Sequence, residues 1–411
     1  MKILFFTHYF PPEVNAPASR TYEMCKRWVR DGHAVEVITG APNAPDGILY
    51  EGYRNRLTQS ETMDGIRVTR VWTFLAANKG TTLRMVNYLS YMVSAFVRSL
   101  FVRRPDIIIA TSPQLFCGWA GYLASLVRRT RLVIESRDMF AESITTLTSV
   151  KEGRLIRWIR KLEFFLYKRG DRLVTVGPGY KRKLVAGGVP ESHIDIITNG
   201  VDREVFDPAT DGSGARAQYG LGDSFVVTYA GTIGMAHGLQ VVLDAAEQLE
   251  RESGNRVVFL LVGEGAEREN LEREAVARGL KSVRFMGKIP KAAMPALLAA
   301  SDCCLVHLRK APLYTSVLPS KMFEMAHMKK PIILGVTGDA AEVVREAGCG
   351  ICIEPGDAGK LVAAVRRLQA EPETARAMGQ AGWEYVGANY DRDVLARNYL
   401  ALLTTIVGPI K

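Results

Sequence analysis

The sequence has few cysteines, only six in 411 residues. So few cysteines exclude a scaffold held by disulfides and fit a reducing compartment. Hydrophobic residues make up 47% of the chain and charged residues 23%, an ordinary balance that excludes extended disorder and a polytopic membrane protein. Low-complexity tracts and repeats of short period are also missing. The length suggests two or three globular domains.

The start of the chain lacks the marks of a signal peptide. MKILFFTHYF has one lysine and a short apolar run, but no small-residue cleavage site, and Pro11, Pro12 and Glu13 follow at once. The pattern predicts a first β-strand. Together with the few cysteines, it predicts a cytoplasmic protein.

Acidic residues are scarce in the first half only. Residues 1–205 contain 30 Lys and Arg against 19 Asp and Glu, whereas residues 206–411 contain 23 against 24. This asymmetry suggests two domains with different partners. A basic surface suits nucleic acid, an anionic membrane or a phosphorylated substrate.

Short apolar runs alternate with amphipathic stretches along the whole chain. Runs such as IIIA and LVIE show little alternation, as expected for parallel strands covered by helices on both faces. The pattern predicts an α/β fold with two doubly wound, Rossmann-like domains. The expected strands are 2–6, 34–39, 66–72, 106–111, 131–136, 172–176, 195–198, 225–230, 257–262, 283–286, 304–308 and 331–334. The expected helices include 20–30, 82–104, 155–169, 239–251, 266–278, 294–300, 321–327 and 340–347.

The pattern restarts after residue 205. We therefore expect a first domain over 1–205 and a second over 206–390, with a C-terminal helix near 391–411 packing back on the first. The segment DPATDGSGARAQYGLG (207–222) is rich in Gly, Ala and Asp and is the expected linker. Two such domains form a cleft, and ligands bind outside the carboxyl ends of their strands.

Two glycine-rich turns follow neighbouring strands of the second half, in YAGTIGMAHGL (229–239) and LLVGEG (260–265). Glycines let backbone amides approach a phosphate, and the helix that follows adds the positive end of its dipole. One such turn can be a plain tight connection, but two on adjacent strands favour a nucleotide lying across their ends. The candidate residues are Gly231, Thr232, Gly234, His237, Gly263, Glu264, Gly265 and Arg268.

A third segment, VLPSKMFE (317–324), places Pro319 and Ser320 at the start of a helix. Free amides there and the Lys321 cation predict an anion site. Glu324 lies three residues after Lys321, so both project on one face, where the carboxylate could accept two ribose hydroxyls. The alternative is an ordinary ion pair on the helix surface.

A fourth segment, ESRDMFAES (135–143), follows a strand of the first half and carries four charges. A carboxylate facing a cleft could orient an acceptor hydroxyl or act as a base, and Asp138 is the candidate. The alternative is a surface pair between Arg137 and Glu142, with Asp138 capping a helix.

Taken in order, these motifs resemble those of the retaining glycosyltransferases of family 4, which have the GT-B fold. The resemblance covers nearly the whole chain. Its markers are KIL (2–4) leading to FPPE (10–13), DGHAVEV (31–37), VGPGY (176–180), ITNGVD (197–202) and the motifs of the second half. The bacterial branch with L-fucosamine and colanic-acid transferases is most similar, because it shares segments like APNAPDG (41–47), RDMFAES (137–143) and LPSK (318–321).

The chain departs from the family pattern in several places. Glu324 fits the second position of the family's Glu-x7-Glu pair, but Ser316 stands at the first. His237 stands near the usual phosphate-loop lysine, so Lys321 is the expected substitute cation. Many relatives have a histidine where Asp138 stands. The first-loop glycines are replaced by Asn-Ala-Pro-Ala (15–18).

The resemblance implies a metal-independent, retaining transfer in which the leaving diphosphate helps to deprotonate the acceptor. The residues expected to be catalytic are Asp138, Lys321 and Glu324. Those expected to bind the donor are Gly231, Thr232, Gly234, His237, Gly263, Glu264, Gly265, Arg268, Pro319, Ser320, Lys321 and Glu324. Those expected to bind the acceptor are Glu13, Asn15, Arg20, Arg137 and Glu142. His8 also lies at the end of an expected strand, where it suits contact with a substrate and capping of the loop equally well.

No metal and no cofactor are expected besides a nucleotide-sugar donor, for which UDP is the predicted nucleotide. The single Asp-x-Asp, Asp391 to Asp393, opens an expected helix, where two acids suit the dipole. The pair Cys349 and Cys352 has no second pair at zinc-ribbon spacing and alternates like a half-buried strand.

Two helical segments of the first half carry apolar and basic residues together. Residues 82–104 are apolar but contain Arg84, Asn87 and Arg98, so a core helix is favoured over a membrane span. Residues 155–172 mix Trp and Phe with many basic residues, which is typical of a helix at an anionic membrane surface. A core helix with a solvated basic face explains this segment equally well.

The predicted function is transfer of an N-acetylamino sugar from a UDP-sugar to a lipid-linked or saccharide acceptor, in the assembly of a bacterial surface polysaccharide such as O-antigen. The predicted location is cytoplasmic, with peripheral contact to the anionic inner membrane and no nucleic-acid partner. Two rivals stay open: an isomerase like the UDP-GlcNAc 2-epimerases, which share the two-domain fold, and a non-catalytic membrane-docking protein.

Overall fold

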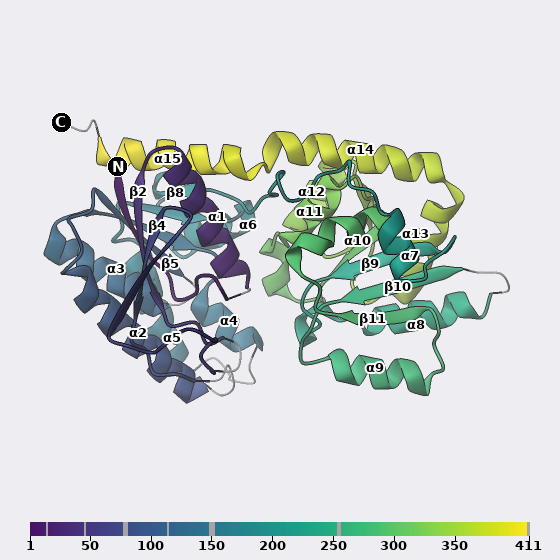
Figure 1. The fold of residues 1–411 in the computed structure, drawn as a ribbon, viewed down its shortest axis with the longest axis horizontal. Helices are drawn as coiled ribbons and strands as arrows, with labels where there is room; N and C mark the ends of the chain where they lie inside the picture. Colours follow the sequence, from purple (N-terminus) through teal and green to yellow (C-terminus); the bar gives the residue numbers. More distant parts are fainter. Residues whose placement is uncertain are drawn as a thin grey trace. The chain divides into compact units, whose positions relative to one another are not determined.

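The computed structural model describes residues 1–13, 15–44, 47–76, 81–112, 115–147, 153–252 and 256–408. The chain divides into two compact units, one made of Met1–Thr198 with Asp393–Lys411 and one made of Asn199–Arg392. Each unit is a mainly parallel sheet with helices on both faces (Figure 1). The α/β architecture with two Rossmann-like units is therefore confirmed.

Unit 1 contains an eight-stranded sheet in the order β3-β4-β2-β1-β5-β6-β7-β8. Every pair of neighbours is parallel except β3 and β4. The strands are β1 (Lys2–Phe6), β2 (Ala34–Gly40), β3 (Thr58–Met63), β4 (Ile66–Val71), β5 (Ile107–Ser112), β6 (Arg131–Ser136), β7 (Arg172–Thr175) and β8 (Ile194–Ile196).

Both faces of this sheet are buried, because successive strand residues enter different cores. Leu4 and Phe6 pack against one set of helices, whereas Ile3 and Phe5 pack against the other. The first set is α2 (Thr81–Ser99), α3 (Leu115–Arg128), α4 (Phe140–Leu147), α5 (Arg154–Tyr167) and α6 (Pro178–Ala186); the second is α1 (Ala16–Arg30) and α15 (Arg392–Val407).

The C-terminal helix α15 packs on α1 in unit 1. Tyr399 lies edge-on to Trp28, with 5.3 Å between the ring centroids. The indole N–H of Trp28 donates to the carbonyl of Ala396 at 3.2 Å. The chain thus returns to the unit in which it began.

Unit 2 contains a six-stranded parallel sheet in the order β11-β10-β9-β12-β13-β14. Its strands are β9 (Phe225–Ala230), β10 (Val257–Val262), β11 (Val283–Gly287), β12 (Cys303–His307), β13 (Ile332–Gly335) and β14 (Gly350–Cys352). One face is covered by α8 (Gln240–Glu250), α9 (Arg268–Ala277) and α13 (Ala358–Ala370). The other is covered by α7 (Ser213–Gln218), α10 (Met294–Ala300), α11 (Lys321–His327), α12 (Asp339–Ala347) and α14 (Pro372–Asn389).

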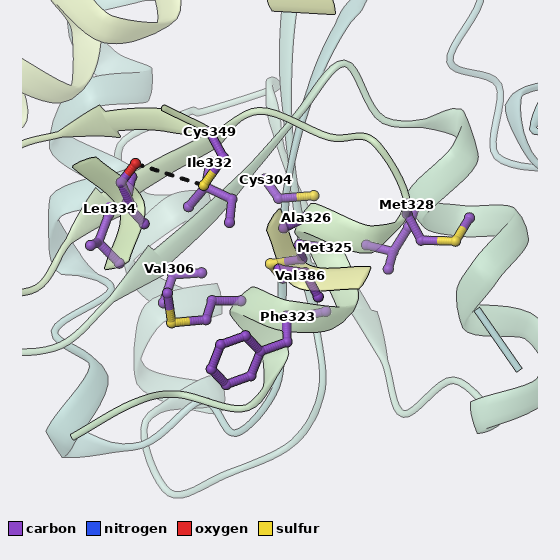
Figure 2. Close-up of a cluster of buried hydrophobic side chains, with 14 of the residues drawn as sticks. Cys304, Val306, Phe323, Met325, Ala326, Met328, Ile332, Leu334, Cys349 and Val386 are labelled. Atoms are coloured by element: carbon purple, nitrogen blue, oxygen red, sulfur yellow. Dashed lines mark hydrogen bonds between the residues drawn. The ribbon is translucent and has the colours of Figure 1, made fainter. Parts of the chain in front are cut away.

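Helix α11 is anchored by its apolar side chains. Met322, Phe323, Met325 and Ala326 are buried in one core cluster with residues of β12 and β13. Figure 2 shows Phe323, Met325 and Ala326 in this cluster. Phe323 also stacks on Tyr390, with 4.2 Å between the ring centroids. This packing fixes the orientation of the polar residues on the same helix.

Two predictions about the chain's organisation were wrong. The expected linker, residues 207–222, is part of unit 2, because it forms α7 and buries Ala215 and Leu221 in the core. The units instead separate at Thr198 and again at Arg392. The helix expected over 82–104 ends at Ser99.

Strand β3 was not predicted. Its sequence TQSETM is polar, and it lies at the edge of the sheet with alternating exposed residues. It pairs with β4 through a two-residue turn in which Asp64 has φ 46° and Gly65 has φ 77°. Such Asp-Gly turns are typical of two-residue hairpins, so this signal was available in the sequence.

Candidate functional site

The most unusual side chain of unit 2 is Lys321. Its Nζ is buried from solvent and, among the described residues, has no hydrogen-bond partner. It lies 3.7 Å from the centroid of the Tyr229 ring, and a Cβ added to Gly231 would lie 3.0 Å from it. Burial lowers the pKa of Lys321 to about 7. A buried ammonium without a carboxylate partner is costly unless an anion binds beside it.

The two glycine-rich turns lie against each other, next to Lys321. Gly231 donates its N–H to the carbonyl of Val262 at 2.9 Å, and Ile233 donates to that of Glu264 at 2.9 Å. A Cβ on Gly263, where φ is +134°, would lie 1.9 Å from the carbonyl oxygen of Gly231. These glycines therefore allow the two turns to pack in contact.

This packing corrects the role predicted for two glycines. Their amides were expected to face a phosphate, but Gly231 bonds Val262 and Gly263 donates to the carbonyl of Gly287 at 2.8 Å. They shape the site instead of contacting the ligand through these N–H groups. Contacts of Thr232, Gly234 and Gly265 with a donor stay predictions.

His237 lies in the first turn and is neutral near pH 7. Burial, with a further effect from the Lys321 cation, lowers the pKa of His237 to about 4. Its Nδ1 is buried and, in the part of the chain that the structure describes, has no hydrogen-bond partner. The imidazole can therefore offer a hydrogen bond to a ligand but not a positive charge.

His307 was not predicted as part of the site. It is the buried last residue of β12, and its Nδ1 donates to the carbonyl of His237 at 2.6 Å. Its Nε2 accepts from the N–H of Gly356 at 3.0 Å, which fixes the neutral tautomer. His307 thus holds the first turn beside Lys321. A polar residue ending the apolar run CCLV was the available signal.

Glu324 is on the same helix as Lys321 but, among the described residues, lies within ion-pair distance of Arg392 and not of Lys321. Its Oε1 lies 3.9 Å from the guanidinium of Arg392, which itself donates to the carbonyl of Gly200 at 2.9 Å. Burial raises the pKa of Glu324, and the charge of Arg392 opposes that shift. Pro319 and Ser320 precede the helix and accept from Met322 and Phe323. Donor contacts by these residues stay predictions.

Glu264 and Arg268, the charged residues of the second turn, form an ion pair with each other. This hydrogen bond lowers the pKa of Glu264. A phosphate contact by Arg268 would have to compete with this carboxylate. The role predicted for both residues is untested.

In unit 1, Asp138 follows β6 at its carboxyl end. Its Oδ1 accepts from the phenol of Tyr180 at 2.5 Å. Burial raises the pKa of Asp138, although this hydrogen bond and the nearby Arg137 oppose the shift. A carboxylate with a raised pKa suits proton transfer, so its catalytic role remains a prediction with a physical basis.

The alternative considered for this segment was wrong in both parts. Glu142 pairs with Lys183 at 2.7 Å and not with Arg137. Helix α4 is capped from α5, since Glu163 accepts from the N–H groups of Phe140 at 2.6 Å and Ala141 at 3.3 Å. An acceptor contact by Glu142 stays a prediction.

Arg20 and Arg137 lie in a buried network around Glu135. The Nε atoms of Arg20 and Arg137 lie 3.1 and 2.7 Å from Glu135 Oε1. Arg20 also donates to the carbonyls of Ile197 and Thr198, and Arg137 to the hydroxyl of Thr21. The two cations lower the pKa of Glu135 to about 2. This burial corrects the expectation that the two arginines face an acceptor: they join β6, α1 and the end of β8.

Glu13 and Asn15 organise the loops after β1. Glu13 is buried and accepts from the N–H groups of Asn43 and Ala44, both at 3.0 Å. Asn15 caps α1 by accepting from the N–H of Ala18 at 2.9 Å. Both side chains thus form hydrogen bonds within the protein, and this geometry disfavours direct contacts with an acceptor.

The carboxylates of the Asp-x-Asp motif are paired with arginines. Asp391 pairs with Arg203 at 3.1 Å, and Asp393 pairs with Arg27 at 2.6 Å and Arg30 at 2.8 Å. Within the described residues, no three His, Cys, Asp or Glu side chains are grouped to hold a metal ion. The six cysteines, all in described segments, are free thiols.

Comparisons with known proteins agree with the two units. A family model described as glycosyl transferase 4-like domain matches residues 15–200, and one described as glycosyl transferases group 1 matches residues 214–384. Over 419 residues the chain is 28% identical to a putative colanic acid biosynthesis glycosyl transferase, WcaI, of Escherichia coli K12, covering 97% of this chain and 99% of that protein.

Solved structures show the same fold. Sucrose-phosphate synthase (tll1590) from Thermosynechococcus elongatus superposes with a TM-score of 0.78 at 18% identity, covering 98% of each chain. Anabaena Alr3699/HepE in complex with UDP-glucose gives a TM-score of 0.73 at 18% identity, covering 98% of this chain and 100% of that one. The chain therefore belongs to the GT-B glycosyltransferases that combine a 4-like domain with a group 1 domain.

Proposed function

We propose that this glycosyltransferase moves a sugar, an N-acetylamino sugar by our prediction, from a UDP-sugar to a lipid-linked or saccharide acceptor in the assembly of a bacterial surface polysaccharide. Similarity to the relative named for colanic acid biosynthesis supports the polysaccharide role. The related fold that holds UDP-glucose supports UDP as the nucleotide. We place the enzyme in the cytoplasm, in peripheral contact with the membrane.

The buried ammonium of Lys321 carries this proposal. It is unpartnered among the described residues and lies beside two glycine-rich turns at the carboxyl ends of β9 and β10. A diphosphate there would compensate the buried charge and restore the charged state of the lysine. The same cation would stabilise the diphosphate as it leaves.

The proposed transfer retains configuration at the sugar's anomeric carbon. The bond from this carbon to the diphosphate oxygen breaks, and a bond to the acceptor oxygen forms on the same face. The acceptor hydroxyl gives its proton to the leaving diphosphate, and Asp138 is the candidate that orients this hydroxyl. Positioning and charge stabilisation supply the rate enhancement.

We propose that the reaction needs no metal ion. Lys321 supplies the positive charge that a metal supplies in other transferases, and the carboxylates of Asp391 and Asp393 are already paired with arginines. Transfer should therefore continue in the presence of EDTA. Loss of activity in EDTA that Mg²⁺ or Mn²⁺ restores would contradict this part of the proposal.

Thermal stabilisation by nucleotides tests the donor. UDP should raise the melting temperature of the wild-type protein more than GDP or ADP does, and Lys321→Met should abolish the shift. Lys329→Met is the matched control, because Lys329 also lies over an aromatic ring, that of Trp383 at 4.6 Å, but is exposed. A shift with GDP and none with UDP would overturn the donor assignment.

The products distinguish transfer from the rivals. We expect UDP release only when an acceptor is present. Epimerisation of UDP-GlcNAc without an acceptor would support the isomerase. Unchanged polysaccharide in cells carrying folded Lys321→Ala and Glu324→Ala variants would support a non-catalytic role.

A further inference from the structure

A large cavity lies at the amino ends of the strands of unit 1, whereas the candidate site residues of this unit follow carboxyl ends. Its volume is about 920 Å³. It is formed where β1 and β6 begin and where α3 and α15 end. Its charged lining residues are Lys2, Arg104, Asp106, Arg129, Arg131, Arg169 and Asp171. We refer to it as the amino-edge cavity.

The two acids of the amino-edge cavity are already engaged. Asp106 accepts from the backbone N–H of Lys2 at 2.7 Å. Asp171 accepts from the backbone N–H of Leu132 at 2.8 Å and pairs with Arg131 at 2.7 Å. The side chains of the other four basic lining residues have no carboxylate partner in the described segments. The cavity therefore attracts anions.

Arg129 occupies a backbone position that glycine normally fills. It follows α3 with φ 48°, and Thr130 then donates to the carbonyl of Ser125 at 3.0 Å to close the helix end. Glycine favours this left-handed conformation, and arginine adopts it at an energetic cost. Arginine nonetheless stands at this position, and Arg129 is one of the residues that line the cavity.

An exposed apolar stripe runs along α2 to the cavity. Its residues follow at intervals of three or four, which places them on one face of the helix. Within α2 they are Leu83, Val86, Leu89, Val93 and Val97, and Phe101 continues the stripe in the turn after the helix ends at Ser99. Phe101, at the end of the stripe, is 76% exposed. Arg128 joins this end to α3 by donating to the carbonyls of Leu100 and Val102, both at 2.7 Å.

Exposed acidic residues are missing from three helices on this side, α2, α3 and α5. The sequences of α2 and α3 contain no Asp or Glu, and the only acid of α5, Glu163, is buried. The three helices cover the same side of the sheet (Figure 1). Helices α3 and α5 add further exposed apolar residues, namely Leu126, Val127, Leu155, Trp158 and Phe165.

We propose that unit 1 docks on an anionic phospholipid bilayer, with the α2 stripe in the bilayer interface and lipid headgroup phosphates in the amino-edge cavity. Basic residues beside exposed apolar ones match a membrane interface in charge and polarity. A second copy of the same face would meet it with like charge. In the described segments no helix has the length and apolar character to cross a bilayer.

This surface is where unit 1 would make the membrane contact included in the proposed function. Its binding to membranes can be tested without a sugar donor. The full-length protein is mixed with sucrose-loaded vesicles of phosphatidylcholine, with or without phosphatidylglycerol, and sedimented. We expect binding to the anionic vesicles that weakens as salt is raised. Equal binding to both vesicle types, or none, would overturn the proposal while leaving glycosyl transfer untouched.

Paired variants test the cavity. Arg104→Gln with Arg129→Gln should weaken binding roughly 30-fold, since each basic residue near such a surface contributes about a fivefold effect. Arg54→Gln with Arg56→Gln removes the same charge from exposed positions elsewhere in unit 1 and should change binding much less. Equal losses of vesicle binding in both pairs of variants would contradict a specific role of the cavity.

Arg129→Gly separates loss of binding from loss of folding. Glycine suits the local φ, so this variant should keep or raise the melting temperature while weakening vesicle binding. Transfer to a water-soluble acceptor should be unchanged. A variant that binds vesicles as the wild type does would overturn the role of Arg129.

The apolar stripe has its own matched pair. Phe101→Ser should lower vesicle binding about tenfold, because a phenyl ring no longer enters the interface. Val276→Ser, at a site 77% exposed in unit 2, should have no effect. Dimerisation of the wild type that Phe101→Ser abolishes would assign the face to a second copy, and preference for an RNA or an acidic protein over vesicles would also overturn the proposal.

Discussion

Donor binding should be coupled to protonation of Lys321. Burial lowers the pKa of this lysine to about 7 in the free protein. A bound diphosphate favours the charged form, so its pKa should rise well above 8 in the complex. Binding at pH 8 therefore requires uptake of a proton that most free molecules lack.

The size of the effect follows from linkage. With a pKa near 7, roughly nine in ten lysines are charged at pH 6 but only about one in ten at pH 8. Donor affinity should therefore fall roughly tenfold from pH 6 to pH 8, and proton uptake should rise from about 0.1 to about 0.9 per donor bound. Tighter binding at low pH is the expected sign, because the complex holds more protons than the free protein.

Isothermal titration calorimetry measures both quantities. UDP-GlcNAc is a suitable probe, because both phosphates of its diphosphate are esterified and do not titrate near neutral pH. Titrations at pH 6, 7 and 8, in two buffers of different ionisation enthalpy, give affinity and proton uptake together.

Other groups near Lys321 set the controls. His237, with a pKa of about 4, stays neutral over this range, and His307 has its pKa lowered by burial. Glu324 has a raised pKa, so Lys321→Met is needed to assign the proton. Affinity independent of pH in the wild type, or the same proton uptake in Lys321→Met, would refute the reasoning.

Three further substitutions test how the units are built. Gly263→Ala should destabilise unit 2 by at least ~3 kcal/mol in urea unfolding, because its Cβ would lie 1.9 Å from a carbonyl oxygen. Gly279→Ala, also at positive φ but with open space around it, should cost only ~1 kcal/mol. Equal losses in the two variants would contradict the close packing of the glycine-rich turns. His307→Ala should raise the KM for the donor by loosening the first glycine-rich turn, with a smaller effect on kcat; an unchanged KM would remove its positioning role. Glu135→Gln should cost roughly 3–5 kcal/mol of unfolding free energy near neutral pH, because two buried arginines lose their carboxylate. Because folding lowers the pKa of Glu135, its stabilising effect is present above the unfolded pKa near 4.3 and is lost as the pH falls toward 2. Equal losses of unfolding free energy in the wild type and in Glu135→Gln over this pH range would contradict this role.

The sheets were predictable because parallel strands covered on both faces have a distinctive sequence. Uninterrupted apolar runs such as VVFLLV of β10 can be placed without knowledge of the fold. The polar edge strand β3 has no such apolar run, and only the Asp-Gly turn that joins it to β4 indicates a strand there. The linker was misplaced because composition alone does not reveal that Ala215 and Leu221 are buried.

The site was predictable where local sequence determines geometry. Lys321 could be found because a strand, a proline and a helix start place it next to the glycine-rich turns. Among the described residues its ammonium lacks a hydrogen-bond partner, and its surroundings are formed by Tyr229 and Gly231, which are far away in the sequence and cannot be placed from local spacing.

Long-range partners explain the predictions that failed. Arg20 and Arg137 look like ligand-binding residues beside strand ends, but Glu135 and distant carbonyls engage them. The cap on α4 comes from Glu163, more than twenty residues further along the chain. Such pairings depend on the fold and cannot be derived from local spacing.

The central claim is that the enzyme transfers a sugar from a UDP-sugar and that Lys321 neutralises the leaving diphosphate. The most direct measurement is the rate of nucleotide release from a panel of UDP- and GDP-sugars with a lipid-linked acceptor, with the product identified by mass spectrometry. We predict acceptor-dependent release, a product heavier by one sugar residue, and a kcat lowered about 10²-fold or more in Lys321→Met but not in Lys329→Met. Product formed only from GDP-sugars, or full activity in Lys321→Met, would contradict the account.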